Sequence, residues 1–192
     1  MFEVFIKYLS DKANLTGMEL ARIKSLSIPK KLRKRQYLLQ EGDVCIYGAF
    51  ICKGCLRIYR VSEDGTEHIM RFAVENWWAS DRESYTTGLP SKCNIDALED
   101  SEILLWTKDN FETLLNEIPE FKAFSERLLA GSFNSAQRRI YAGISNTAEE
   151  KYNDFIRLYP EIFNRVPLHM VASYLGISRE TLSRIRSQFA HK

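Results

Sequence analysis

The sequence predicts an α+β fold. It comprises an N-terminal antiparallel β-roll, jelly-roll-like in layout, with flanking helices, then a long helix and a C-terminal three-helix domain. Short β-branched and aromatic runs separated by turn residues fill residues 32–107. A proline-free stretch with apolar residues at helical spacing covers residues 120–144. Two short helices joined by a glycine turn are indicated at residues 167–188.

Composition is that of an ordinary globular protein. The 192 residues are 45% hydrophobic and 27% charged, and the net charge of +2 does not by itself favour nucleic acid. No stretch approaches the ~20 apolar residues that a membrane span needs, and the N-terminus lacks a signal-peptide pattern. Four cysteines beside a large core suit a reducing compartment. We therefore expect a cytoplasmic location and no membrane partner.

Two short helices are expected over residues 1–27, with a break near residues 14–17, because apolar residues recur at helical spacing on both sides of that break. Ile28-Pro29 ends the second helix. The basic run at residues 30–35 is typical of the solvated face of an edge strand rather than of a nucleic-acid patch.

Short antiparallel strands at regular spacing then imply a jelly roll or sandwich. Turn signals occur at 41–43, 53–54, 64–65 and 99–101. The expected strands cover residues 37–39, 47–52, 56–61, 67–73, 77–78, 94–98 and 103–106.

Lys53-Gly54 predicts a hairpin turn in which Cys52 and Cys55 face each other as small core residues. A metal or redox site is the alternative. The other candidate ligands, Cys45, Cys93 and His68, stand at no spacing typical of a metal site, so we expect no metal.

A short helix over residues 110–119 is expected to close the roll. The helix over residues 120–144 would be roughly 37 Å long, which is long for a small domain to bury by itself. Its apolar stripe and small residues favour a parallel two-fold dimer, and packing on its own roll is the alternative. The residues assigned to the dimer face are Phe121, Phe124, Leu128, Ala136, Ile140 and Ile144.

A capping box at residues 146–150 predicts a new helix that runs to about Tyr159. It marks a domain boundary, so that residues 1–145 form the first domain and residues 146–192 the second. Within the second, Pro167 suits a first helical position and Gly176 ends that helix. Ser178 can cap the next helix.

The outer face of this last helix has the chemistry of a DNA-reading surface, while Leu182 and Ile185 form its inner stripe. An arginine fork matches guanine O6 and N7, and each good pair contributes about 1–3 kcal/mol of discrimination. A helical hairpin with a merely solvated charged face is the alternative. After Ile177 the chain has four basic residues, Arg179, Arg184, Arg186 and Lys192, and one acidic residue, Glu180, so positive charge is concentrated in this segment. The residues assigned to DNA contact are Ser178, Arg179, Glu180, Thr181, Ser183, Arg184 and Arg186.

The segment S-R-E-T-L-S-R-I at residues 178–185 resembles the recognition helix of the Crp/Fnr family of bacterial transcription regulators. The resemblance implies that Arg179, Glu180 and Arg184 face base edges, and that Ser178 and Thr181 lie near backbone phosphate.

The order of turns in the strand region resembles the cyclic-nucleotide-binding β-roll of the same family, whose dimer helix corresponds to residues 120–144. Family members normally continue into a β-hairpin wing after the recognition helix. This chain, which ends at Lys192, resembles the shorter wingless branch.

The family's nucleotide binders hold the cyclic phosphate with helix N-terminal amides and an arginine about ten residues after a Gly-Glu turn. Here Ser80-Asp81 replaces Gly-Glu, and Pro90-Ser91 falls where the arginine pair would begin. We expect no binding of cyclic AMP in the usual way; another effector, or none, stays open. The residues assigned to a ligand pocket are Trp77, Trp78, Asp81, Arg82, Tyr85, Ser91 and Lys92. The alternative for the two tryptophans is that one packs in the roll and the other at an interface.

The first expectation is a homodimeric, sequence-specific transcription regulator that binds double-stranded DNA at an inverted repeat, with half-sites about 34 Å apart. The family implies RNA polymerase and an unknown small-molecule effector as further partners, and no cofactor is expected. An enzyme is disfavoured because, of the three histidines, only His68 lies in the strand region. A ligand-sensing adaptor without DNA binding is the remaining alternative.

Overall fold

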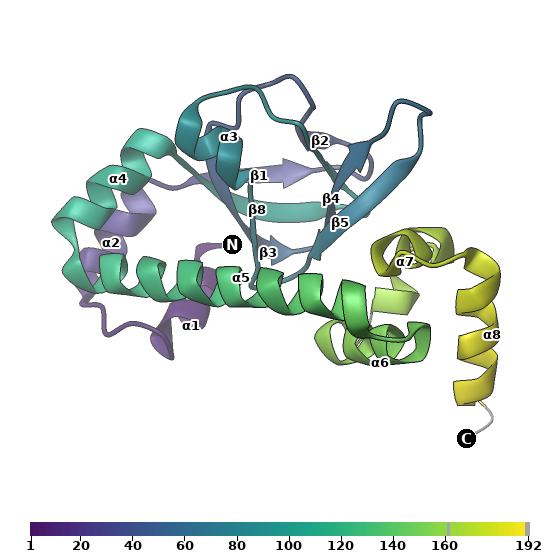
Figure 1. Cartoon of the computed structure of the whole chain (residues 1–192). Coiled ribbons are helices and arrows are strands. Elements are labelled where there is room, and N and C mark those ends of the chain that lie inside the picture. Colours follow the sequence, from purple (N-terminus) through teal and green to yellow (C-terminus); the bar gives the residue numbers. More distant parts are fainter. Residues whose placement is uncertain (161, 191–192) are drawn as a thin grey trace.

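The α+β class is confirmed in the computed structural model, which describes residues 1–160 and 162–190. Two antiparallel sheets form the roll, the long helix α5 runs beneath them, and a small helical head sits at the far end (Figure 1). Lys192 lies outside the described residues. No helix within the described ranges is long and apolar enough to span a membrane.

Two N-terminal helices, α1 (Phe2–Ser10) and α2 (Gly17–Ser25), pack against the roll as expected. A reciprocal capping box between Thr16 and Glu19 starts α2. Phe5 and Ile23 are buried in a cluster with Trp106, whose indole nitrogen donates a 3.2 Å hydrogen bond to the carbonyl of Ile23. This cluster closes one side of the roll.

The roll consists of two four-stranded sheets. The first has the order β1 (Ile28–Leu32), β8 (Ser101–Thr107), β3 (Tyr47–Lys53) and β6 (Trp78–Ala79). The second has the order β2 (Tyr37–Leu39), β7 (Asn94–Ala97), β4 (Leu56–Val61) and β5 (Glu67–Ala73). The strand β1 is an edge strand, which agrees with the solvated basic run expected there.

The predicted hairpin at Lys53-Gly54 is wrong. Strand β3 belongs to the first sheet and β4 to the second, so the chain crosses between sheets at Gly54. A φ of 108° and the closeness of Ser101 leave no room for a side chain there. Cys52 therefore packs toward α1 and Cys55 toward the helical head, and both are free, buried thiols.

Three helices follow the strands or interrupt them. The short helix α3 (Arg82–Thr87) was not predicted, although Asp81 caps its start and Gly88, at a φ of 74°, ends it. Helices α4 (Lys108–Glu117) and α5 (Pro119–Ser145) lie close to the two helical ranges expected.

The head contains α6 (Ala148–Leu158), a 3-10 turn η1 (Ile162–Asn164), α7 (Leu168–Leu175) and α8 (Arg179–Ala190). The capping box that starts α6 is present between Thr147 and Glu150. Pro167 precedes α7 as its N-cap instead of taking its first position. Gly176 adopts a φ of 66° and ends α7, as the turn requires.

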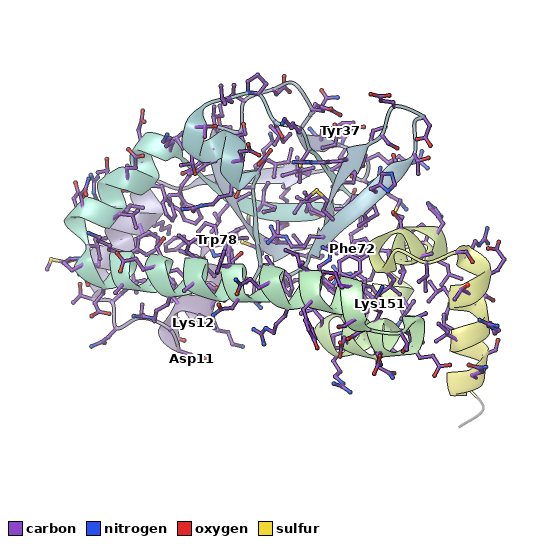
Figure 2. The ribbon with its side chains drawn as sticks, viewed as in Figure 1. Asp11, Lys12, Tyr37, Phe72, Trp78 and Lys151 are labelled. Carbon is purple, nitrogen blue, oxygen red and sulfur yellow. The ribbon has the colours of Figure 1, made fainter. Side chains whose placement is uncertain are left out.

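The head and the roll share one hydrophobic cluster. Tyr59, Ile69 and Phe72 on the outer face of the second sheet pack with Phe155 and Tyr159 of the head. Phe72 lies where the roll meets the head (Figure 2). The chain breaks between α5 and α6 at Asn146 and Thr147, and one hydrophobic cluster joins the outer face of the second sheet to the head.

Candidate nucleic-acid interface

The helix α8 turns one face inward and one outward. Leu182 and Ile185 are buried in the head, and the hydroxyl of Ser178 accepts a 3.1 Å hydrogen bond from the backbone N–H of Thr181, which caps the helix as expected. The outward residues Arg179, Glu180, Ser183, Arg184 and Ser187 line one open hollow.

Ser187 was missed by the sequence reasoning. It stands three positions after Arg184 and four after Ser183, so extending the helical period by one turn would have found it. Its hydroxyl adds a donor and acceptor to the same surface.

Glu180 is the acidic residue on this surface. Its own backbone N–H and the hydroxyl of Ser178 hold the pKa of Glu180 below its ordinary value. It is therefore an anion near neutral pH, beside the cations of Arg179 and Arg184. A carboxylate can accept a hydrogen bond from the amino group of cytosine, so this set of residues can recognise both bases of a G·C pair.

Three of the assigned residues, Ser178, Thr181 and Arg186, do not line this hollow. The guanidinium of Arg186 lies 4.8 Å from the centre of the Phe163 ring, so it is directed back toward η1 and does not line the hollow. In the chain without DNA this charged group stacks on an aromatic ring of its own domain, and contact of Arg186 with DNA stays a prediction. The hydroxyl of Ser178 donates a 3.1 Å hydrogen bond to that of Thr181.

The inside of the roll is packed with apolar side chains. They include Leu39, Ile51, Leu56, Ile95 and Leu105, all buried in one cluster. Tyr85 packs against the same cluster, and burial raises the pKa of its hydroxyl to about 12. Arg82 and Lys92 are exposed, so neither supplies a positive charge inside the roll.

Asp81 uses its hydrogen-bonding capacity within the chain. One carboxylate oxygen accepts from the backbone N–H groups of Glu83 and Ser84, at 3.1 and 3.4 Å. The other accepts from the hydroxyl of Ser91 at 2.6 Å. A negative side chain thus already occupies the first amides of α3, where the family resemblance would place a phosphate.

Arg60 is a second residue that the sequence reasoning missed. Its Nε donates to the Sγ of Cys93 at 3.4 Å, and this contact, ahead of the nearby carboxylates of Asp81 and Glu83, raises the pKa of Arg60. It lies on the neighbouring strand β4, so the local sequence around Asp81 carries no sign of it.

The two adjacent tryptophans do not wall a common pocket. The ring of Trp77 lies 5.3 Å from that of Tyr159 in the head. The ring of Trp78 lies 5.8 Å from Phe5 and 5.4 Å from Trp106, toward α1. The two rings therefore point to different parts of the molecule, which favours the alternative of one ring in the core and one at an interface.

The long helix also differs in part from expectation. Phe121 and Phe124 are buried against the chain's own N-terminal helices, with Leu128 packed beside them, so these three do not face a partner. The second half of α5 is exposed instead, including Ala136. Its large exposed apolar residues are Leu129, Phe133, Ile140, Tyr141 and Ile144.

No cluster of metal-binding side chains is present in residues 1–160 and 162–190: no three His, Cys, Asp or Glu residues lie close enough together to hold an ion. The described part of the chain thus consists of a filled β-roll, a half-exposed long helix and a helix-turn-helix with an open outer face. This combination is a β-roll joined through a long helix to a helix-turn-helix head.

Comparison with known proteins agrees with that class. Residues 29–117 match the cyclic nucleotide-binding domain family. The regulatory protein HlyX of Actinobacillus pleuropneumoniae is 25% identical over 193 residues, covering 91% of this chain and 77% of HlyX. The structure of FixK2 from Bradyrhizobium japonicum superposes with a TM-score of 0.72 at 19% identity, covering 86% of this chain and 85% of FixK2.

A transcriptional regulator of the Crp/Fnr family from Eubacterium rectale superposes with a TM-score of 0.70 at 16% identity, covering 96% of this chain and 88% of that one. The chain thus resembles regulators of the Crp/Fnr family in sequence and fold. HlyX is named a regulatory protein, which agrees with the regulator expected from the sequence.

Proposed function

We propose that the chain is a homodimeric transcription regulator that binds an inverted repeat in double-stranded DNA. The observation that carries the proposal is the outer face of α8, where Arg179, Arg184 and Glu180 lie together and open to solvent. Their positions are fixed from behind, because Leu182 and Ile185 are buried. A helix held in this way can enter a major groove with its arginines toward base edges.

The exposed half of α5 supports the homodimer. Leu129, Phe133, Ala136, Ile140 and Gly143 are separated alternately by four and three positions, which is the spacing of a two-stranded coiled coil. Phe133 and Ile140 are 62% and 65% exposed in the single chain. A second copy that packs along this seam would remove the ring of Phe133 and the aliphatic side chain of Ile140 from water. Small residues at Ala136 and Gly143 allow the two helices to approach closely.

The filled roll favours a regulator that does not respond to cyclic AMP. The interior is lined by buried apolar side chains, and Asp81 would repel a cyclic phosphate. RNA polymerase and an effector of another kind stay predictions from the family resemblance.

The test is selection of bound sequences from a random DNA pool by the purified ligand-free chain, with a parallel selection that contains cyclic AMP. The proposal expects an inverted repeat in both, with half-sites about 10 base pairs apart, centre to centre. A repeat recovered only with cyclic AMP would overturn the proposal for the roll. No enrichment in either would favour the adaptor and contradict DNA binding.

A further inference from the structure

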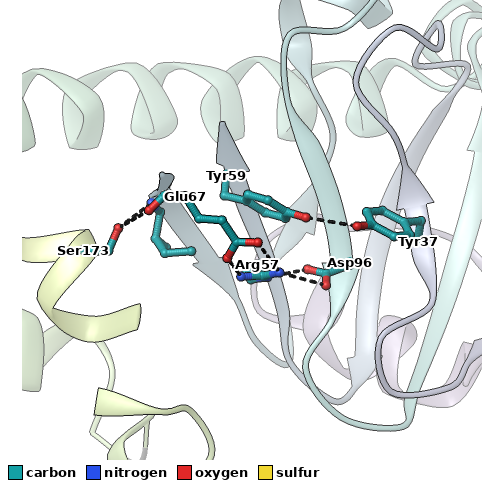
Figure 3. Close-up of polar contacts among 7 residues, drawn as sticks. Tyr37, Arg57, Tyr59, Glu67, Asp96 and Ser173 are labelled. Atoms are coloured by element: carbon teal, nitrogen blue, oxygen red, sulfur yellow. Dashed lines mark hydrogen bonds and ion pairs between the residues drawn. The ribbon is translucent and has the colours of Figure 1, made fainter. Parts of the chain in front are cut away.

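The head is attached to the roll at an open strand edge. The strand β5 is the outermost of the second sheet, so alternate backbone groups along it point away from the sheet. The hydroxyl of Ser173, on α7, accepts from the N–H of Ile69 at 3.0 Å and donates to the carbonyl of Glu67 at 2.9 Å. One serine thus pairs two outward backbone groups of β5 (Figure 3).

The strand end that receives Ser173 is held from within the sheet. The carboxylate of Glu67 pairs with Arg57, which is in turn held by Asp96 at 2.7 Å (Figure 3). Arg57 also lies over the ring of Tyr59, 4.0 Å from its centre. The contact point on the roll is therefore a rigid one.

A second attachment is ionic. Arg165, between η1 and α7, pairs with Glu75 at 2.8 Å and with Glu99 at 2.6 Å. Its side chain is only 19% exposed, so these pairs are shielded from solvent more than a surface ion pair is. Glu75 also accepts a 2.7 Å hydrogen bond from the N–H of Gly54, which ties it to the crossing between the two sheets.

The long helix joins the same contact. Arg139 of α5 donates to the carbonyls of Ile69 and Tyr174 at 3.3 and 3.5 Å, and its guanidinium lies 4.1 Å from the centre of the Tyr174 ring. Roll, long helix and head thus meet at one place.

This attachment leaves the reading face free. The hollow lined by Arg179 and Arg184 is on α8, whereas the residues that touch β5 are on α7 and the segment before it. Docking therefore does not hide the DNA-contacting surface. What it fixes is the direction and distance of α8 relative to α5.

We propose that Ser173 and Arg165 are positioning residues that set the spacing between the two half-sites. The inference rests on the proposed dimeric DNA binding. The link from α5 to α6 is only Asn146 and Thr147, and a link alone leaves the head free to pivot. In a dimer, pivoting of both heads would widen the range of distances between the two α8 helices. A change of one base pair moves a half-site by about 3.4 Å and turns it by roughly 35°, so small pivots matter.

The experiment measures affinity for a set of duplexes that carry the selected half-sites at the optimal spacing and at one and two base pairs more or fewer, together with a single half-site. The variants are Ser173→Ala, Arg165→Gln and the double variant. Arg157→Gln is the matched control, because Arg157 is an exposed head arginine that, among the described residues, pairs with Asp154 of its own helix.

We expect the wild-type chain and Arg157→Gln to prefer one spacing by about tenfold or more, and the double variant to lose most of that preference, while affinity for a single half-site stays within about twofold. Glu75→Gln with Glu99→Gln loosens the same contact from the roll side and should give the same result if the double variant folds poorly. If both double variants, Ser173→Ala with Arg165→Gln and Glu75→Gln with Glu99→Gln, kept the spacing preference of the wild type, this inference would be overturned and the proposed function would stand. Absence of half-site binding by the wild type would instead overturn the proposed function, and this inference with it.

Discussion

The hydroxyl of Ser91 and the carboxylate of Asp81 are joined by a 2.6 Å hydrogen bond, so two residues at the family's nucleotide-binding positions satisfy each other. Ser91 stands where an arginine pair would begin, and it is buried. The two side chains satisfy each other's hydrogen bonds without a ligand, and Asp81 supplies a negative charge where a phosphate would need a positive one.

Cyclic AMP should therefore leave the protein unchanged. At ~1 mM nucleotide, a ligand with a dissociation constant of ~10 μM would add about 2.7 kcal/mol to the free energy of unfolding. We expect no such stabilisation, measured as the midpoint of thermal unfolding with and without the nucleotide. A midpoint that rises by several degrees would show that the roll opens to admit it.

Arg184→Ala should lower affinity for the selected operator and relax the base preference at one position in each half-site. The expected loss is about 1–3 kcal/mol per half-site, because a bidentate contact to guanine is removed. Arg186→Ala serves as the matched control, since that guanidinium stacks on Phe163. Titration of operator duplexes that differ at single positions measures both. An equal loss of base preference in the two variants would contradict the assignment of the reading face.

Ile140→Asp should convert the dimer into monomers at micromolar concentration. The substitution would bury two carboxylates facing each other across the two-fold axis, and like charges in a seam repel. Sedimentation velocity at a series of concentrations measures the change. Met18→Asp, at a residue that is 83% exposed on α2, is the control and should stay dimeric. A dimer that survives Ile140→Asp would place the interface elsewhere.

Acid should loosen the contact between roll and head. Burial raises the pKa of Glu75, but hydrogen bonds from Arg165 and the N–H of Gly54 outweigh it and hold the pKa below its ordinary value of 4.5. A carboxyl whose pKa is lowered by folding contributes stability above its unfolded pKa, and this is lost as pH falls through the folded value. The free energy of unfolding should thus fall below about pH 4.5, and less steeply in Glu75→Gln. Glu63→Gln, on the exposed turn after β4, should follow the wild type in urea unfolding at each pH.

Cys45, Cys52 and Cys55 should react slowly with thiol reagents in the folded protein. Burial raises the pKa of Cys52 to about 11 and that of Cys55 to about 12, and it raises that of Cys45 as well, so few thiolates exist at pH 8. Labelling by iodoacetamide should accelerate strongly in denaturant. Met18→Cys provides an exposed thiol for comparison in the same chain. Rapid labelling of a native cysteine at the rate of that control would indicate that the core opens readily.

Local patterns predicted much of the fold. The capping box at Thr147, the turn at Gly176 and the cap at Ser178 are short-range features, and each was found where the sequence places it. The inner stripe of α8 follows from helical spacing alone.

The errors concern which neighbour a residue meets. Nothing local distinguishes a hairpin at Gly54 from a crossing between sheets, since both need a glycine with positive φ. Phe121 and Ile140 both belong to the apolar stripe of α5. Only the position of the N-terminal helices decides which of the two is buried. Likewise, the contact of Ser173 with β5 joins residues more than a hundred positions apart.

In the proposed dimer, two recognition helices read the two halves of an inverted repeat. Hydroxyl-radical footprinting of the wild-type chain on a selected operator tests it most directly. We expect protection on one face of the duplex in two symmetric regions centred about one helical turn apart. A single protected region, or weak protection spread evenly along the duplex, would contradict it.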